Sequence, residues 1–284
     1  MAEKKAWDIV RSSGMAGTGN WEKFDLPLGL IVNAAQTWRQ KVEGVEKPWL
    51  CWNMNDAWCL LQQRLIREVG WTPVVGWDPN CGKSVPPLVP GAIAIDFNEG
   101  LNLQALWPHV PLEFAFLWCD RLAFWHADLL VPLPKLQEIV ARFETLKDGE
   151  MTAVLDYGGR RNLLKYRTHR YWELLGCTTR GASRDLFDKG CGWWRQFWAH
   201  PNCPSEAERH RRKKYYYDQG VGIMYWKRRY GGKVYPLKLK DLVSGHFSEI
   251  GARQYKKGAS KAEELEMNFD LKQSAKSMGL EDFL

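Results

Sequence analysis

Residues 56–78, DAWCLLQQRLIREVGWTPVVGWD, decide the fold class because they change from one periodicity to another. Trp58, Leu61 and Leu65 recur at the spacing of one helix face, so the first part predicts an amphipathic helix. Gly70 can end this helix, and WTPVVGWD then predicts a short strand. A helix that passes directly into a strand is a building unit of α/β folds.

The same alternation is found on both sides of this stretch. Before it, LGLIVNAAQTW (28–38) is interpreted as a buried strand that runs into a helix. After it, GAIAIDF (91–97) and MTAVLDYGG (151–159) predict strands, and LPKLQEIVARFETLKDG (133–149) predicts a helix. EFAFLWCDRLAFWHADLLVP (113–132) fits either a helix followed by a strand or two strands. We therefore expect an α/β fold with a mostly parallel central sheet flanked by helices.

Length and composition predict one large domain. The chain has 284 residues, of which 45% are hydrophobic, and this is enough to bury a sizeable core. We expect a polar lead-in over residues 1–25, a single domain over 26–250, with an irregular part from 160 to 204, and a charged helical tail over 251–284. No apolar run is long enough to span a bilayer and the polar start is unlike a secretory signal, so the sequence favours a cytoplasmic protein.

The cysteines predict thiols rather than disulfides. There are seven of them, an odd number, and no two are spaced as CxxC. Cys191 and Cys203 flank His200, but this spacing matches no standard zinc site.

Positive charge is concentrated in one segment. Residues 208–240 hold eleven Lys or Arg against two acidic residues, a net charge of +9, whereas the whole chain carries +7. Tyrosines and one tryptophan are interleaved with these cations. This composition suits phosphates together with bases or sugars, which makes DNA a candidate partner. An anionic lipid surface, an acidic glycan, or simply a solvated basic helix followed by a strand would fit it as well.

His126 and Asp128 interrupt the apolar run AFWHADLLVP (123–132). In a strand, residues i and i+2 face the same side, so an imidazole and a carboxylate would be presented together. Burying a carboxylate is costly unless a cation, a donor or a metal compensates it. Taken singly, each residue also has a purely structural explanation: His126 could hydrogen-bond to the backbone, and Asp128 could cap the next helix. The pair at the end of a strand favours a ligand site, because ligands of open α/β sheets bind at the carboxyl ends of strands.

The order of a strand, His126-Ala-Asp128, LLVP and a helix resembles GT-A glycosyltransferases, in which a DxD motif ends a central strand and holds a divalent cation on the donor diphosphate. The resemblance spans residues 28–248 in the order of elements. LGLIVNAA looks like the first nucleotide-binding strand, FDKGCGWWRQFW like an acceptor-side loop, and SGHFS like the position of a late metal-binding histidine. The departure is His126, which replaces the first aspartate of DxD.

The resemblance implies a GT-A-like catalytic domain, a nucleotide-sugar donor such as a UDP-sugar, and Mn2+ or Mg2+ as the metal. The metal would be bound by Asp128, His126 and His246, and the donor by Asn33, Ala34, Asp120, His126 and Arg160. The first candidates for the catalytic base are Asp188 and Asp185, followed by Asp156 and Asp218. The acceptor would be bound by Trp193, Trp194, Arg211 and Arg212. An acceptor hydroxyl on a modified DNA base would make this a transferase of the kind bacteriophages use, acting in the host cytoplasm.

Two other classes of function fit the same residues. The chain could be a non-catalytic nucleic-acid-binding protein that uses the basic aromatic segment 208–240. It could also be a metal-dependent phosphoryl-transfer enzyme that uses Asp120, His126, Asp128 and Asp156. The sugar, the nucleotide, the stereochemical outcome and the oligomeric state stay open at this point.

Overall fold

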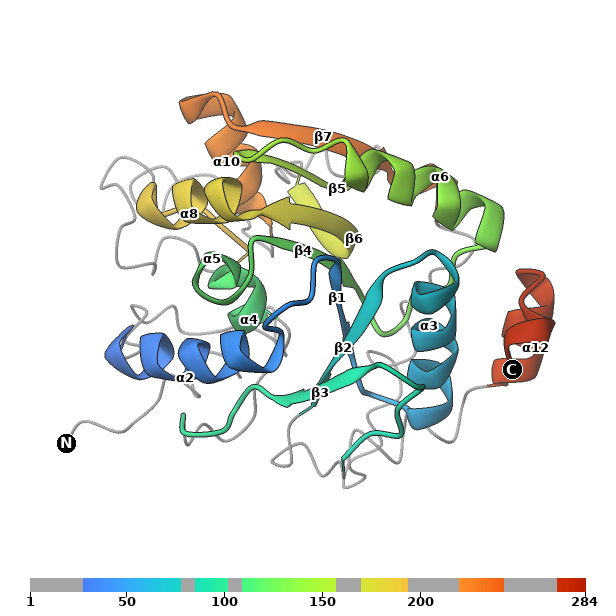
Figure 1. The fold of residues 1–284 in the computed structure, drawn as a ribbon. Helices are drawn as coiled ribbons and strands as arrows, with labels where there is room; N and C mark the ends of the chain where they lie inside the picture. Colours follow the sequence, from blue (N-terminus) through green and yellow to red (C-terminus); the bar gives the residue numbers. More distant parts are fainter. Residues whose placement is uncertain (1–27, 78–84, 102–108, 157–169, 194–219, 243–269) are drawn as a thin grey trace, which may run out of the picture.

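A computed structural model describes residues 28–77, 85–101, 109–156, 170–193, 220–242 and 270–284 (Figure 1). Seven strands form one sheet in the order β3-β2-β1-β4-β6-β5-β7. They are β1 (Pro48–Trp52), β2 (Thr72–Trp77), β3 (Ile93–Asp96), β4 (Arg121–Trp125), β5 (Glu150–Asp156), β6 (Arg170–Thr179) and β7 (Lys233–Lys238). β6 pairs antiparallel with β4 and β5, and the remaining pairs of this described sheet are parallel. The prediction of an α/β fold with a mostly parallel sheet is therefore confirmed.

Helices cover both faces of the sheet (Figure 1). One layer contains α2 (Leu28–Lys41), α4 (His109–Glu113), α5 (Ala115–Trp118), α8 (Arg180–Asp188) and α10 (Val221–Tyr230), and the other contains α3 (Asp56–Glu68), α6 (Leu133–Glu144) and α12 (Leu271–Ser277). Alternate strand residues serve the two layers. Leu50 and Trp52 of β1 belong to the first core, whereas Trp49 and Cys51 belong to the second. Both faces of the central strands are thus apolar, as a covered parallel sheet requires.

Several predicted elements are confirmed. The helix in 56–68, the strand in 72–77, the strand in 93–96, the helix in 133–144 and the strand in 150–156 lie where the periodicity placed them. The ambiguous stretch 113–132 contains a short helix followed by a strand. In the described part of the chain no helix combines the length and the apolar character that crossing a membrane requires.

The prediction of a strand in LGLIVNAAQTW is wrong, since this segment is the helix α2. Ile31, Ala34, Ala35 and Trp38 are buried at helical spacing, while Val32 is 43% exposed. The aliphatic residues suggested a strand, but their period is that of a helix. The first strand among the described residues is β1, PWLCW, which begins at Pro48, after α2 and not within it.

The region expected to be irregular, 160–204, contains β6 and α8 in its described part. The described end of the C-terminal tail also has a fixed place. Ala275 and Leu280 are fully buried in the second core, and Arg64 of α3 donates a hydrogen bond to the Phe283 carbonyl at 2.6 Å. Residues 270–284 are therefore part of the folded body.

Candidate functional site at the carboxyl edge of the sheet

The topology singles out one place on the sheet. From β1 the strands β2 and β3 follow on one side, whereas β4 lies on the other side of β1. In open α/β sheets such a reversal of strand order marks the point where ligands bind, beyond the carboxyl ends of the strands. Cys51 of β1 is in register with Trp125 of β4, and β1 ends at Trp52 and β4 at Trp125, so Asn53 and His126 each follow the carboxyl end of one of two neighbouring strands.

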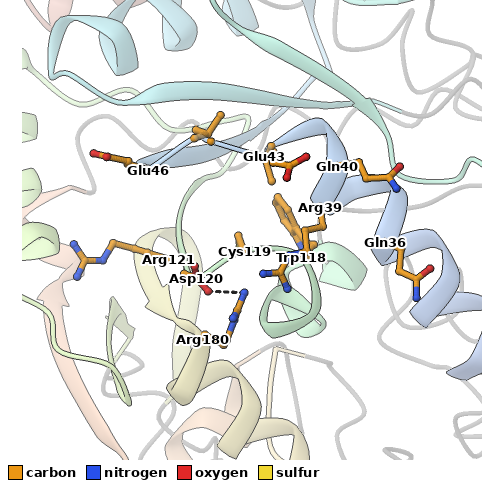
Figure 2. Close-up of a pocket in the computed structure, with 13 residues that line it drawn as sticks. Gln36, Arg39, Gln40, Glu43, Glu46, Trp118, Cys119, Asp120, Arg121 and Arg180 are labelled. Atoms are coloured by element: carbon orange, nitrogen blue, oxygen red, sulfur yellow. Dashed lines mark ion pairs between the residues drawn. The ribbon is translucent and has the colours of Figure 1, made fainter.

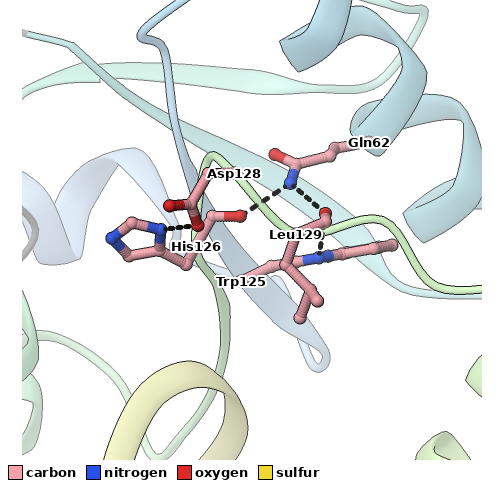
Figure 3. A network of polar contacts seen from close by, with 5 residues as sticks. All are labelled: Gln62, Trp125, His126, Asp128 and Leu129. Carbon is pink, nitrogen blue, oxygen red and sulfur yellow. Dashed lines mark hydrogen bonds and ion pairs between the residues drawn. The ribbon is translucent and has the colours of Figure 1, made fainter. Parts of the chain in front are cut away.

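His126 and Asp128 meet at this point, as the sequence predicted. β4 ends at Trp125, so both residues lie in the turn that follows the strand and not within it. The Nδ1 atom of His126 contacts Oδ1 of Asp128, and the two side chains are 32% and 19% exposed (Figure 3). An Nδ1–H that donates to the carboxylate would direct the lone pair of Nε2 away from it, which is the tautomer that a metal ligand needs.

Gln62 and Trp125 hold the turn in place (Figure 3). Gln62, fully buried on α3, donates through Nε2 to the carbonyl oxygens of His126 and Leu129 at 2.9 and 3.1 Å. The indole of Trp125 donates to the same Leu129 carbonyl at 2.9 Å. Hydrogen bonds therefore connect the backbone of the turn to α3. These bonds fix the positions of the His126 and Asp128 side chains.

The end of β1 adds an amide to this edge. Asn53 is 2% exposed, its backbone N–H donates to the Gly76 carbonyl at 2.8 Å, and its Nδ2 donates to Asp56 at 2.8 Å. Its Oδ1 is buried and has no hydrogen-bond partner among the described residues. A buried carbonyl oxygen without a donor is costly, so this atom is suited to accept a hydrogen bond from a ligand.

The contact between Nδ1 of His126 and Oδ1 of Asp128 makes Asp128 a partner of the imidazole and not a second ligand of a metal on Nε2. One cation could take both side chains only if this contact is broken. Imidazole and carboxylate suit Mn2+, and carboxylates with substrate phosphates are common ligands of Mg2+. Within the described ranges no group of three or more His, Cys, Asp or Glu side chains is placed to hold a metal ion. With the contact between His126 and Asp128 broken, the pair would leave the remaining positions of a metal to a diphosphate and water, and the predicted third ligand, His246, lies outside the described residues.

The structure does not bring Asp120 to this site. Asp120 precedes β4, whereas His126 follows it, so the two lie at opposite ends of the strand, about 20 Å apart at about 3.3 Å per residue. Asp120 instead pairs with Arg180 at 2.5 Å. Asn33 and Ala34 do not end a strand either. They lie within α2, with Asn33 exposed and Ala34 6% exposed against the core.

The two carboxylates proposed as the base lie on α8 and are already engaged. Asp185 accepts a hydrogen bond from the indole of Trp226 at 2.6 Å. Asp188, whose side chain is 50% exposed, pairs with Arg184 at 3.2 Å. Of the residues expected to contact the acceptor, Trp193 is 2% exposed and packs on Phe124 with ring centroids 4.9 Å apart, so it belongs to the core. Arg160, Trp194, Arg211 and Arg212 lie outside the described residues.

Sequence reasoning missed Asn53, Asp56 and Gln62. NMND directly follows PWLCW, and polar residues after a buried strand are the signal that also identified His126 and Asp128. The signal was lost because PWLCW was not recognised as a strand. Five of the cysteines are described, and all are buried free thiols, in agreement with the prediction of reduced cysteines at Cys51, Cys59, Cys119, Cys177 and Cys191.

Comparison with protein-family models gives no match, and comparison with curated proteins gives none either.

Proposed function

We propose that this chain is a metal-dependent glycosyltransferase of the GT-A kind that transfers a sugar from a nucleotide-sugar to an acceptor hydroxyl. The observation that carries the proposal is the contact between His126 and Asp128 at the carboxyl end of β4, next to the end of β1. A parallel sheet with one reversed strand, flanked by helices on both faces, supports the proposal at the level of the fold.

His126 and Asp128 would hold Mn2+ or Mg2+ at this point, and the cation would neutralise the charge that develops on the nucleoside diphosphate leaving group. Gln62 keeps the turn that carries both ligands in position. Asn53 offers its unpaired Oδ1 to a donor group of the nucleotide or sugar. Asp188 is the proposed base toward the acceptor hydroxyl, because its exposed pair with Arg184 is weak and can be released.

The test is nucleotide release from UDP-, GDP-, CMP- and dTDP-sugars with and without manganese. We expect slow, manganese-dependent release from one donor, and a loss of about 100-fold in Asp128→Asn because the leaving group loses its charge stabilisation. Asp241→Asn, at an exposed position in a short turn after β7, is the matched control and should release nucleotide like the parent. Equal release by Asp128→Asn and the parent, or no release from any donor, would contradict the proposal.

A second candidate function is nucleic-acid binding, either as the means of holding a DNA acceptor or as the whole activity. The described end of the basic aromatic segment exposes cations on α10, on β7 and on the 3-10 helix η3 (Leu239–Asp241) that follows β7. They are Arg228, Arg229, Lys233, Lys238 and Lys240, and Tyr230 and Tyr235 are 38% and 49% exposed among them. Exposed cations with aromatic rings suit phosphates and stacked bases.

Retention of duplex and single-stranded DNA separates these functions. Charge reversal at Arg211, Arg212, Lys213 and Lys214 should abolish salt-sensitive binding, while Asp128→Asn should leave it unchanged. If DNA is bound and no donor is hydrolysed, the non-catalytic function stands. If metal-dependent strand cleavage appears and is lost in Asp128→Asn, the site is one of phosphoryl transfer.

A further inference from the structure

A pocket of about 480 Å³ lies at the edge of the sheet opposite to the candidate site (Figure 2). Its wall is built from the end of α2 and the turn after it, from Cys119 and Asp120 ahead of β4, and from Arg180 at the start of α8. The volume is in the range of pockets that hold small molecules. Because β6 is antiparallel, Arg180 follows β6 at the same edge where β4 begins.

Two guanidinium groups flank one end of this pocket (Figure 2). Arg39 makes no hydrogen bond or ion pair with any described residue. Arg180 pairs with Asp120 through Nη2 at 2.5 Å, while its Nε is buried and has no partner in the described part of the chain. Burial raises the pKa of the nearby Cys119 thiol, Cys177 and Asp120 raise it further, and Arg180 and Arg39 oppose that rise. Arg39, Arg180 and Asp120 together give this end of the pocket a net positive charge.

Two carboxylates and two amides also line the pocket, together with a third arginine, Arg121, whose guanidinium donates a hydrogen bond to the Leu146 carbonyl at 2.7 Å. Glu43 and Glu46 lie on the turn after α2, and the described residues provide no ion-pair partner for either. Gln36 and Gln40 of α2 lie on the side of Glu43, whereas Glu46 lies at the opposite side of the pocket (Figure 2). Carboxylate and amide oxygens accept hydrogen bonds from hydroxyl or ammonium groups.

We propose that this pocket binds a small phosphate monoester whose other end carries hydroxyl or amino groups. The phosphate lies between Arg39 and Arg180, since a guanidinium fork binds phosphate through two parallel hydrogen bonds. The donor groups of the organic part reach Glu43 and the glutamines. Asp120 does not compete strongly for Arg180, because the two side chains are 78% and 38% exposed and water screens the pair.

The proposal is independent of the transferase function, because the pocket and the His126–Asp128 pair lie at opposite edges of the sheet. A ligand here would act as a regulator or as a second substrate that binds away from the proposed donor site.

Titration calorimetry of the full chain tests the pocket with glucose 6-phosphate, phosphoethanolamine and inorganic phosphate. We expect Arg39→Gln and Arg180→Gln each to weaken binding of all three by about tenfold or more. Glu43→Gln should weaken binding of the two esters and leave inorganic phosphate unchanged. Arg142→Gln, which removes an exposed arginine on α6, is the control and should bind like the parent.

The loss of affinity of the two esters in Glu43→Gln distinguishes an amino phosphate from a sugar phosphate. A stronger loss for phosphoethanolamine than for glucose 6-phosphate in Glu43→Gln identifies an amino phosphate, and the reverse identifies a sugar phosphate. Arg39 lies on the exposed side of α2 without a described partner, so its replacement leaves folding intact. If Arg39→Gln binds all three probes like Arg142→Gln, or if no probe binds, the proposal is overturned.

Discussion

Gln62 shows how one buried amide positions a functional turn. It is fully buried and donates to two carbonyl oxygens of the turn that carries His126 and Asp128. In Gln62→Leu these oxygens lose a donor, although Leu129 keeps the one from Trp125. We expect the free energy of unfolding to fall by about 1–2 kcal/mol.

Urea unfolding of Gln62→Leu measures this loss, and amide hydrogen exchange shows whether it is local to residues 126–129. Gln137→Leu, at an exposed position on α6, provides the control with the same chemical change. Equal stability of the two variants would show that the hydrogen bonds of Gln62 contribute nothing net.

Glu150, at the start of β5, gives a prediction about pH. The backbone N–H of Lys147 lowers the pKa of its carboxyl group against the effect of burial, and the hydroxyl of Tyr235 and the charge of Lys233 lower it further. A lowered folded-state pKa contributes stability above the unfolded-state value, about 4.3, and loses it as the pH falls through the folded-state value.

Glu150→Gln should therefore be less stable than the parent at pH 7, and the difference should shrink as the pH falls below about 4. Thermal unfolding of both proteins from pH 7 to pH 3 measures this. A difference that stays constant over that range would mean that the charge of Glu150 does not matter. Glu144→Gln, exposed at the end of α6, controls for the removal of a surface charge.

At the scale of elements, periodicity predicted the fold better than residue type did. The amphipathic helices α3 and α6 were predicted from apolar spacing and are present. The first part of LGLIVNAAQTW was assigned as a strand because of its aliphatic residues, but the whole segment is a helix whose buried residues follow a helical period. PWLCW is buried on both faces and only five residues long, so it offers no alternation from which a strand could be recognised.

β6, RYWELLGCTT, was missed because it lies in the stretch 160–204, which is rich in Trp, Gly and Cys and was therefore expected to be irregular. The packing of the neighbouring strands requires a glycine at position 176. A Cβ there would lie 2.4 Å from the Phe124 ring of β4 and 2.4 Å from the Thr152 carbonyl of β5. The strand fits between its two neighbours only because this side chain is absent.

Gly176→Ala should therefore destabilise the protein by about 1–3 kcal/mol, since the backbone of β5 or the ring of Phe124 must shift. Urea unfolding compared with Gly29→Ala provides the test. Gly29 lies on α2 with nothing within 4 Å of an added Cβ, so alanine there should be neutral or stabilising. If Gly176→Ala were as stable as Gly29→Ala, the sheet would have room that the structure does not show.

At the scale of the whole molecule, the candidate site was only partly predictable. His126 and Asp128 were found because two polar residues stand out in an apolar run, and spacing alone brings them together. Asn53 and Gln62 join them through the pairing of β1 with β4 and the packing of α3, which are contacts between residues far apart in the sequence. The separation of Asp120 from the site follows from the direction of β4, which the sequence did not provide.

The C-terminal segment links the last residues to the second core. Leu280 is fully buried there, and η5 (Glu281–Phe283) packs on α3. Leu280→Ala removes a buried side chain and should cost about 2–5 kcal/mol if residues 270–284 unfold together with the sheet. If the segment can detach by itself, the cost cannot exceed the free energy of that detachment.

Two measurements on Leu280→Ala separate these cases. Urea unfolding gives the loss of global stability, and the rate of limited proteolysis near residue 270 reports detachment of the segment. Leu284→Ala, at a position that is 43% exposed, is the control and should change neither. A large loss of global stability without faster proteolysis shows that the segment and the sheet form one cooperative unit, whereas fast proteolysis with little global loss shows that the segment is docked on a body that is stable without it.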